Sequence, residues 1–399
     1  MMRNKDLSFY SYVIGLFILV LYSMGAYFLW NAAPQYLGLG VTVLGLWHVL
    51  THRNVCHLSP IYCTAAFCLL FSVFWNIDAQ GNVLNYYAGL LLTNIPPTLL
   101  LLSLPEVEKR RILSLFTHWM AWILGISLIG FILLFFIPLP SFGTISNSEV
   151  WDAYEYTNYL IVIKGAFYDI RFNSIFREPG HVAMIASFFL YANHYNFSKR
   201  ENKVLLIASL FTFSLAGYVL LIMGYTLHFF TYDFNKKKIR KVLLWPVGLL
   251  IIWLGAITYN GGNNLLNTLI IERLAFDSDK GIKGNNRVSD QTDRTFEFAW
   301  RNGEIVGGID SKTSSQLRDL GEIAGAGYKI YMLDKGIIGT VAVFLFYFLI
   351  AVKSPNRYYA LGMLILYVLA FLQRAYPTWA AWIVPFICGV SNINIKKKR

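Results

Sequence analysis

The sequence predicts an all-α polytopic membrane protein with about twelve transmembrane helices and two large outer loops. Hydrophobic residues make up 56% of the chain and charged residues only 14%, whereas soluble domains average about 25% charged residues. Apolar runs close to the length that crosses a bilayer recur from one end of the chain to the other. Short clusters of Lys and Arg separate these runs, a pattern that fixes helix orientation in a membrane. We expect one integral membrane domain over residues 1–399.

The apolar runs give the expected order of the spans. They cover Phe9–Trp30, Gln35–Leu50, Pro60–Asn76, Val83–Leu102, Ile112–Ile137, His181–His194, Val204–Phe230, Val242–Tyr259, Gly336–Val352, Tyr358–Leu372 and Tyr376–Val390. The first run has no small-residue cleavage site, so we interpret it as a retained span rather than a signal peptide. The run Val204–Phe230 has basic clusters at both ends. It is therefore predicted to cross twice, with a turn at residues 214–217, which keeps both clusters on one side.

The basic clusters set the predicted orientation. We place all of them in the cytoplasm, which puts both chain termini there: Arg3 and Lys5; Arg53; Lys109–Arg111; Lys199, Arg200 and Lys203; Lys236–Lys241; Lys353 and Arg357; Lys396–Arg399. Among the short outer loops only Arg374 is basic. The long segments 138–180 and 260–335 then lie outside the membrane. Basic residues in loops of this length have little influence on the orientation of the helices.

Several classes of function are disfavoured by missing motifs. The chain has no phosphate-binding loop, no HExxH zinc helix and no GxSxG nucleophile elbow. Charged residues are almost absent from the spans, which disfavours an ion-coupled transporter. The four cysteines form no CxxC pair, so neither a disulfide framework nor a thiolate zinc site is expected. Asp277 and Asp279 form a DxD pair, for which solvation is a better interpretation than metal binding. The net charge of +12 is explained by the Lys and Arg clusters that orient the helices in the membrane. No nucleic-acid partner is therefore expected.

The first outer segment contains the strongest cluster of chemical groups. Arg171 and Arg177 flank Pro179–Gly180, a pair that suits the start of a helix, and helix N-termini attract anions. Glu178 and His181 are three residues apart, so a helix that begins here places both on one side. This combination predicts a site for an anionic lipid head group. The alternative is that Arg177 and Glu178 pair with each other, or that they anchor the span at head-group level.

The second outer segment is rich in arginine with aromatic residues in between. Its stretch Asp293–Trp300 predicts a helix on which Arg294, Glu297 and Phe298 share a face. Arginine suits bidentate capture of phosphate, and aromatic rings stack on sugars. For each arginine alone, a solvated loop charge is the better interpretation, but together with Arg177 they predict a diphosphate clamp. The arginines are Arg273, Arg287, Arg294, Arg301 and Arg318.

Three short patterns resemble one known family. They are FREPGH at Phe176–His181, FTFSLAG at Phe211–Gly217, and GAGYKIYMLDKGIIG at Gly325–Gly339. Each is similar to an element of the Wzy-type polymerases of O-antigen or capsular polysaccharide, which are related to the O-antigen ligases. The first pattern lies at the outer mouth of a span, the second at a hairpin turn, and the third at the close of the large loop. As a topology, the resemblance covers most of the chain.

The resemblance implies glycosyl transfer between two lipid-linked oligosaccharides at the periplasmic face of a bacterial inner membrane. Polyprenyl diphosphate would be the leaving group, Arg177, Arg287 and Arg294 its phosphate-facing cations, and Glu178 or His181 the general base. The expected enzyme is a metal-independent glycosyltransferase without a cofactor. Its expected partners are the lipid-linked substrates, membrane lipids and a regulator of chain length. Further substrate contacts are expected from Arg171, Arg301, Trp300, Tyr328 and Arg374.

Two alternatives stay open at this point. A ligase of the same family would carry arginine where this chain has Leu215 and histidine near Gly325, so both positions favour a polymerase. A flippase for the same lipid-linked substrate would show cationic residues along the spans and two matching halves. Neither feature is evident in the sequence.

Overall fold

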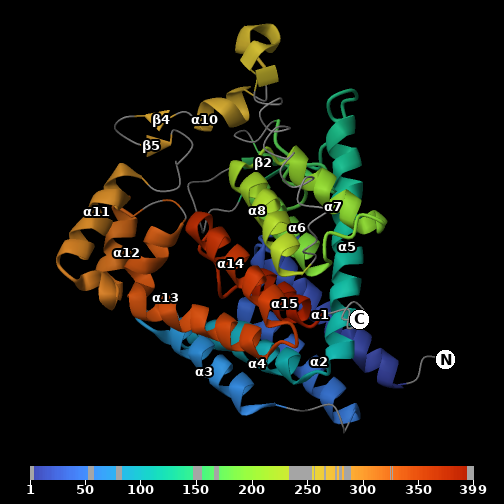
Figure 1. The fold of residues 1–399 in the computed structure, drawn as a ribbon, viewed down its shortest axis with the longest axis vertical. Coiled ribbons are helices and arrows are strands. Elements are labelled where there is room, and N and C mark those ends of the chain that lie inside the picture. The colour runs from blue at the N-terminus through green and yellow to red at the C-terminus, as the bar shows by residue number, and fades with distance from the viewer. Residues whose placement is uncertain are drawn as a thin grey trace.

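The computed structural model describes a mostly helical chain (Figure 1). The described residues are 4–52, 58–77, 83–146, 155–165, 170–232, 254–255, 257–264, 267–274, 276–277, 281–282, 289–323, 325 and 327–392. The main helices are α1 (Asn4–Ser23), α2 (Pro34–Thr51), α3 (Pro60–Phe74), α4 (Val83–Ser103), α5 (Glu106–Leu133), α6 (Pro179–Ala192), α7 (Arg200–Phe211), α8 (Leu215–Thr231), α13 (Tyr328–Lys353), α14 (Arg357–Gln373) and α15 (Ala380–Val390). The expected span Val242–Tyr259 lies largely outside the described residues.

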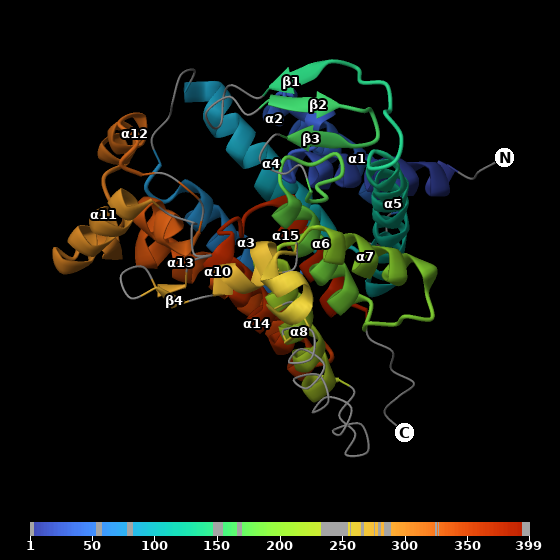
Figure 2. The same ribbon diagram turned by 90° about the horizontal axis from the view of Figure 1, so that it is seen from above.

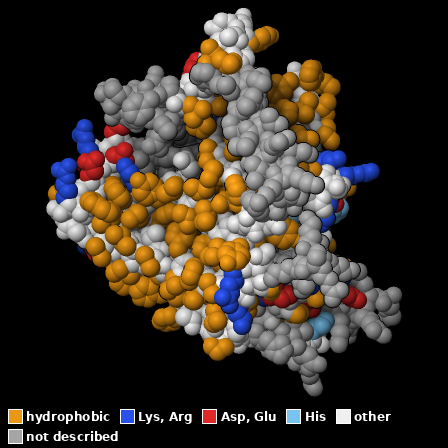
Figure 3. All heavy atoms as spheres, viewed as in Figure 1, with side chains coloured by type: hydrophobic (Ala, Val, Ile, Leu, Met, Phe, Trp, Pro, Cys, Tyr) orange, Lys and Arg blue, Asp and Glu red, His pale blue; other side chains and the backbone are white. Residues whose placement is uncertain are grey.

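Three of the described helices, α1, α5 and α13, are long and apolar enough to cross a membrane. Their surfaces fit that possibility. On α5, Trp122, Ile126, Ile129 and Leu133 form an exposed stripe at helical spacing, and Ile129 is 62% exposed. Figure 3 shows hydrophobic side chains spread over the face formed by α13 and α14, with Lys and Arg towards its margins. Soluble monomers rarely expose contiguous apolar surface of this extent.

The centre of the bundle is formed by α6, in which every residue is buried. It packs against α7, α8 and α15. The rings of Phe188 on α6 and Tyr367 on α14 stack with centroids 4.0 Å apart. Tyr191 and Tyr359 donate their hydroxyl groups to each other's backbone carbonyl at 3.1 and 2.9 Å. Aromatic packing and reciprocal hydrogen bonds therefore fix α6 against α14.

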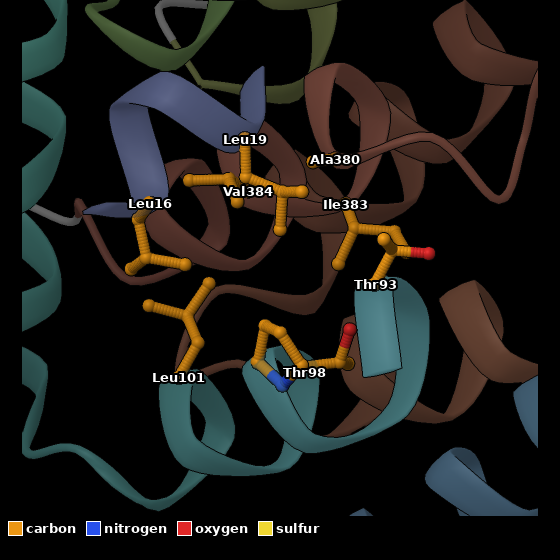
Figure 4. Close-up of a pocket in the computed structure, with 9 residues that line it drawn as sticks. Leu16, Leu19, Thr93, Thr98, Leu101, Ala380, Ile383 and Val384 are labelled. Carbon is orange, nitrogen blue, oxygen red and sulfur yellow. The ribbon is translucent and has the colours of Figure 1, made fainter. Parts of the chain in front are cut away.

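An apolar pocket lies between α1, α4 and α15 (Figure 4). Pro96 and Pro97 lie inside α4, and proline removes a helical hydrogen bond and kinks a helix. Figure 4 shows side chains of all three helices pointing into the space. Because no charged side chain lines it, the pocket has no group for acid–base chemistry. Its lining residues are Leu16, Leu19, Thr93, Pro97, Thr98, Leu101, Ala380, Ile383 and Val384.

The predicted break within Val204–Phe230 is confirmed. Helix α7 ends at Phe211, and α8 begins after Ser214, whose side chain accepts a hydrogen bond from the backbone N–H of Gly217. A Cβ on Gly217 would overlap the methyl group of Ala183 on α6. A serine N-cap and a close helix crossing therefore set the turn.

The two predicted helix boundaries that differ most from the structure are the end of α1 and the start of α13. The first span was expected to reach Trp30, but α1 ends at Ser23 because Gly25 takes a positive φ of 71° and Ala26 pairs with Phe176. The span expected from Gly336 begins earlier, since α13 starts at Tyr328 and is broken at Gly336. That residue has φ 64°, and a Cβ there would overlap the backbone at Gly307. A long-range backbone contact decides each boundary.

The outer segments contain structure that the all-α prediction missed. Strands β1 (Thr144–Ser146), β2 (Glu155–Asn158) and β3 (Ile163–Gly165) form an antiparallel sheet in that order. Strands this short give too few residues for a period of two to be recognised. The second segment contains α10 (Glu272–Leu274), β4 (Phe276–Asp277), β5 (Gly281–Ile282), α11 (Asp290–Arg301) and α12 (Ser311–Asp319). The helix predicted over Asp293–Trp300 is confirmed by α11.

The second outer segment has a small core of its own. Buried apolar side chains from α11, from the segments before and after α12 and from the first turns of α13 form this cluster. Asn76 at the end of α3 donates to the backbone carbonyls of Ile309 and Asp334, at 2.6 Å each. The segment is thereby attached to the C-terminal end of α3 and the N-terminal part of α13. The cluster residues are Ala299, Ile305, Ile309, Ile323, Ile330 and Leu333.

The contact between α2 and α4 gives a test of this fold. A Cβ on Gly38 would overlap the backbone carbonyl of Leu92, whereas a Cβ on Gly40, two residues along the same helix, would meet nothing within 4 Å. We expect Gly38→Ala to destabilise the protein by about 1–3 kcal/mol through overpacking. Gly40→Ala should leave stability unchanged or raise it slightly, since Ala favours helix. Thermal unfolding in detergent measures both, and equal melting temperatures would contradict this packing.

Candidate active site at the start of α6

The segment that leads into α6 is held by three separate parts of the chain. The backbone N–H of Tyr27, after α1, donates to the carbonyl of Ile175 at 3.0 Å. The N–H of Phe172 donates to the carbonyl of Phe211, at the end of α7, also at 3.0 Å. The N–H of Ile163, in β3 (Figure 2), donates to the carbonyl of Ser174 at 2.9 Å. Main-chain contacts therefore fix the residues before α6, which include Arg171 and Arg177.

Helix α6 begins as the sequence predicted. Glu178 is its N-cap residue and Pro179 its first helical residue. Gly180 has a packing role, because a Cβ there would overlap the guanidinium group of Arg374. The absence of a side chain lets the arginine pack directly against the first turn.

A buried ion pair joins this helix start to the end of α14. An Nη atom of Arg374 donates to the carboxylate of Glu178 at 2.5 Å. Arg374 is only 4% exposed, and the Glu178 side chain is 21% exposed. A charge-assisted hydrogen bond of this kind orients the carboxylate strongly. Glu178 thus has a fixed orientation and an edge that solvent reaches, which are the properties needed of a general base or a substrate ligand.

His181 lies behind this pair and is fully buried. Its Nδ1 lies 3.0 Å from the carbonyl oxygen of Met24. A carbonyl only accepts, so Nδ1 is the protonated nitrogen in this contact. The ring meets Tyr376 and Trp379 edge-on, and those two rings stack with centroids 3.8 Å apart. Its Nε2 has no hydrogen-bond partner within the part of the chain that the structure describes. We therefore assign His181 to positioning rather than to contact with substrate.

The two cations before the helix lie at the same end of the bundle. The backbone carbonyl of Arg177 accepts from the hydroxyl of Tyr156 at 2.9 Å, and its side chain is half-buried. The Nε of Arg171 donates to the carbonyl of Thr212 in the α7–α8 turn at 3.0 Å. The structure thus gathers Arg171, Arg177 and the ion pair around the start of α6.

The remaining predicted residues form a second group on α11 and the start of α13. Arg294 is exposed, and Arg301 makes an exposed ion pair with Glu297 at 3.8 Å. Trp300 stacks on Phe296, which also meets Tyr328 edge-on. Figures 1 and 2 both show α11 apart from α6. The described residues therefore do not assemble Arg294 and Arg177 into one clamp.

Part of the predicted site cannot be placed. Arg287 lies outside the described residues, as do Asp279 and the side chains of Arg273 and Asp277. Among the residues that are described, no group of three or more His, Cys, Asp or Glu is arranged to hold a metal ion.

The sequence reasoning missed the aromatic pair Tyr376 and Trp379. It also missed Lys335, whose Nζ donates to the carbonyls of Val73 and Trp75 and so caps α3. Tyr376 and Trp379 follow Arg374 closely in the sequence, at the outer end of a predicted span. This position was the one signal by which the aromatic pair could have been predicted. The position of Lys335 depends on the break at Gly336, for which the sequence offers no comparable signal.

Comparison with known proteins gives no relative from which to transfer a function. No protein-family model matches the chain, and neither a curated protein nor a solved structure shows significant similarity to it. A function for this chain is therefore argued from the geometry around α6 and from the short sequence patterns.

The ion pair makes a prediction about energetic coupling. Glu178→Gln and Arg374→Met each leave one charge without its partner. We expect each to lower the free energy of unfolding by about 3 kcal/mol. This value is at the lower end for buried pairs because Glu178 is partly exposed. The double variant removes both charges and should cost clearly less than the sum. Thermal unfolding of the four purified proteins measures the coupling. Additive losses would show that the two side chains are not paired in the folded protein.

Proposed function

We propose that this protein is a membrane-embedded glycosyltransferase that polymerises lipid-linked oligosaccharide repeat units into O-antigen or capsular polysaccharide. The observation that carries the proposal is the carboxylate of Glu178, oriented by Arg374 at the start of α6 with Arg177 as its neighbour. An oriented, partly exposed carboxylate beside a cation suits glycosyl transfer from a diphosphate donor. The FREPGH pattern that contains this site is also the one that most resembles the Wzy-type polymerases.

The proposal places the chain in the bacterial cytoplasmic membrane with about twelve spans and both termini in the cytoplasm. Exposed apolar stripes on the long helices support this placement. So do the basic clusters at one set of helix ends, among them Lys199 and Lys353. The segments 138–180 and 260–335 are then the two periplasmic loops, and the start of α6 opens towards the periplasm.

The depth of the site suits a substrate that stays attached to lipid. Ser174, four residues before Glu178, donates its hydroxyl to Ser127 on α5 at 2.8 Å. Ser127 lies six residues before the end of α5 at Leu133, which corresponds to about 9 Å along a helix axis. The site is therefore recessed below the outer end of α5. A diphosphate at head-group level reaches such a recess without leaving the membrane.

In the proposed reaction, a sugar hydroxyl of the incoming lipid-linked unit attacks the anomeric carbon of the growing chain. The new glycosidic C–O bond forms as the bond to the polyprenyl diphosphate breaks. Glu178 accepts the hydroxyl proton, Arg374 orients that carboxylate, and the diphosphate leaves with the bonding electron pair. Arg177 stabilises the charge that develops on the diphosphate, an effect that often dominates catalysis. Arg294, Arg301 and Trp300 on α11 are assigned to the glycan and phosphate of the second substrate.

The first test is the ladder of surface polysaccharide from cells that lack the gene and are complemented with variants. Glu178→Gln removes the base and should lower polymerisation about 100-fold or more, which leaves single repeat units on the acceptor lipid. Arg177→Ala, Arg287→Ala and Arg294→Ala should shorten or abolish the ladder. Arg200→Ala, an exposed arginine at the predicted cytoplasmic start of α7, serves as the control and should keep the full ladder at matched protein levels.

The pattern in the deletion strain separates the alternatives. If even the single repeat unit is lost, the protein acts earlier or at ligation, and a flippase or ligase replaces the polymerase. If the deletion gives single units but Glu178→Gln restores long chains at matched protein level, the polymerase stands and Glu178 is not the base.

A further inference from the structure

The turn between β2 and β3 exposes apolar side chains where turns usually carry polar residues or glycine. Leu160 is 57% exposed and Ile161 is 37% exposed. Leu160 also has a positive φ of 67°, a conformation uncommon outside glycine, asparagine and aspartate. We call residues 159–162 the β2–β3 tip. An exposed leucine in this conformation at the end of a hairpin calls for a physical reason.

Hydrogen bonds from within the protein satisfy the backbone of the tip. The N–H of Leu160 donates to the side-chain oxygen of Asn158 at 2.8 Å, and its carbonyl accepts from the hydroxyl of Tyr27 at 2.9 Å. The carbonyl of Ile161 accepts from the hydroxyl of Ser127 at 2.5 Å. The N–H of Ile161 donates to the carbonyl of Tyr159, whose own N–H donates to the carbonyl of Val162. Every backbone N–H and C=O from Tyr159 to Ile161 thus has a partner.

The tip lies beside α5, well below the outer end of that helix. A Cβ on Gly130 would overlap the side chain of Ile161, so the absence of a side chain on α5 makes room for the tip. Above this level the exposed surface is mainly apolar, with the Nζ of Lys164 over the ring of Phe135 at 5.4 Å from its centroid. Phe135, Phe136 and Ile137, which follow α5, are 52%, 79% and 51% exposed.

The surface around the tip is continuous with the exposed stripe of α5. Ile126 and Ile129, the neighbours in sequence of Ser127 and Gly130, are both exposed. Phe28, next to the tyrosine that binds the tip, is 55% exposed. Leu160 and Ile161 therefore belong to one apolar surface. In water, solvent can hydrogen-bond the backbone groups of a turn. In hydrocarbon, each of these groups needs a hydrogen-bond partner from the protein.

We infer that the β2–β3 tip is embedded in the acyl chains of the outer leaflet as a short re-entrant turn. Its partner is lipid hydrocarbon, which covers Leu160 and Ile161, while Tyr27, Ser127 and Asn158 take the place of water at the backbone. The inference rests on the membrane placement proposed above and adds a contact that the glycosyl transfer reaction does not require. The sheet β1–β3, whose Tyr156 holds the backbone of Arg177, is then anchored from below in the bilayer.

Spin labelling in liposomes tests the inference. Cys56, Cys63, Cys68 and Cys388 are first replaced to give a cysteine-free chain. Single cysteines are then introduced by Leu160→Cys, Ile129→Cys and Lys312→Cys, and each carries a nitroxide. The first position is the tip, the second lies on the stripe of α5, and the third is exposed on α12. Collision rates are measured with oxygen, which concentrates in hydrocarbon, and with a water-soluble nickel chelate.

We expect the oxygen-to-nickel ratio at position 160 to match that at position 129 and to exceed the ratio at position 312 several-fold. A ratio at 160 that matches 312, with a high ratio at 129, would overturn the inference and leave the membrane placement intact. A low ratio at 129 as well would overturn both. Because Leu160 is exposed, its labelling should not disturb the core. Monodisperse elution and an unchanged melting temperature verify this for each variant, and Ile161→Cys gives a second reading of the tip.

Discussion

The geometry of the site depends on one contact, the guanidinium of Arg374 packed on Gly180 and bonded to Glu178. Removing two charges from water is costly, and this cost offsets much of their attraction. The main effect of the pair is therefore to fix the position of the Glu178 carboxylate, rather than to stabilise the fold. It joins the end of α14 to the start of the most deeply buried helix. The same helix start is tied to the segment after α1 through His181 and Met24. Three regions that are distant in sequence therefore meet at the start of α6, where the carboxylate of Glu178 lies.

Local sequence signals predicted the elements of this fold better than its contacts. The apolar runs indicated the main helices, the basic clusters at both ends of Val204–Phe230 the break before α8, and Pro179 the start of α6, because each signal lies within or next to the segment concerned. The end of α1 and the break in α13 depend on backbone approaches from distant segments, so no local pattern indicated them. The same holds for the site. Arg177, Glu178 and His181 were recognisable as neighbours, but the partnership between Glu178 and Arg374 spans 196 residues, and the burial of His181 depends on Tyr376 and Trp379.

The second outer segment is a structural unit attached to the bundle rather than part of the site at α6. Its small core closes over the first turns of α13, and Lys329 pairs with Asp293 on α11 at 2.9 Å. Two residues further along α13, Tyr331 meets Phe371 edge-on, and Phe371 lies three residues before Arg374. The two groups of candidate residues therefore lie on opposite sides of the contact between α13 and α14. In the proposed glycosyl transfer, this arrangement would give the two substrates separate surfaces.

The burial of α6 has a consequence for how the chain is assembled. Its 14 residues correspond to about 21 Å of helix, less than the hydrocarbon thickness of a typical bilayer. Its flank against α15 is covered by residues that are synthesised long after α6 itself. During synthesis, this helix therefore exists for most of the time as a short apolar segment with an incomplete set of neighbours. Completion of the core waits until α15 has been synthesised, and the pairing of Glu178 waits for Arg374 at the end of α14.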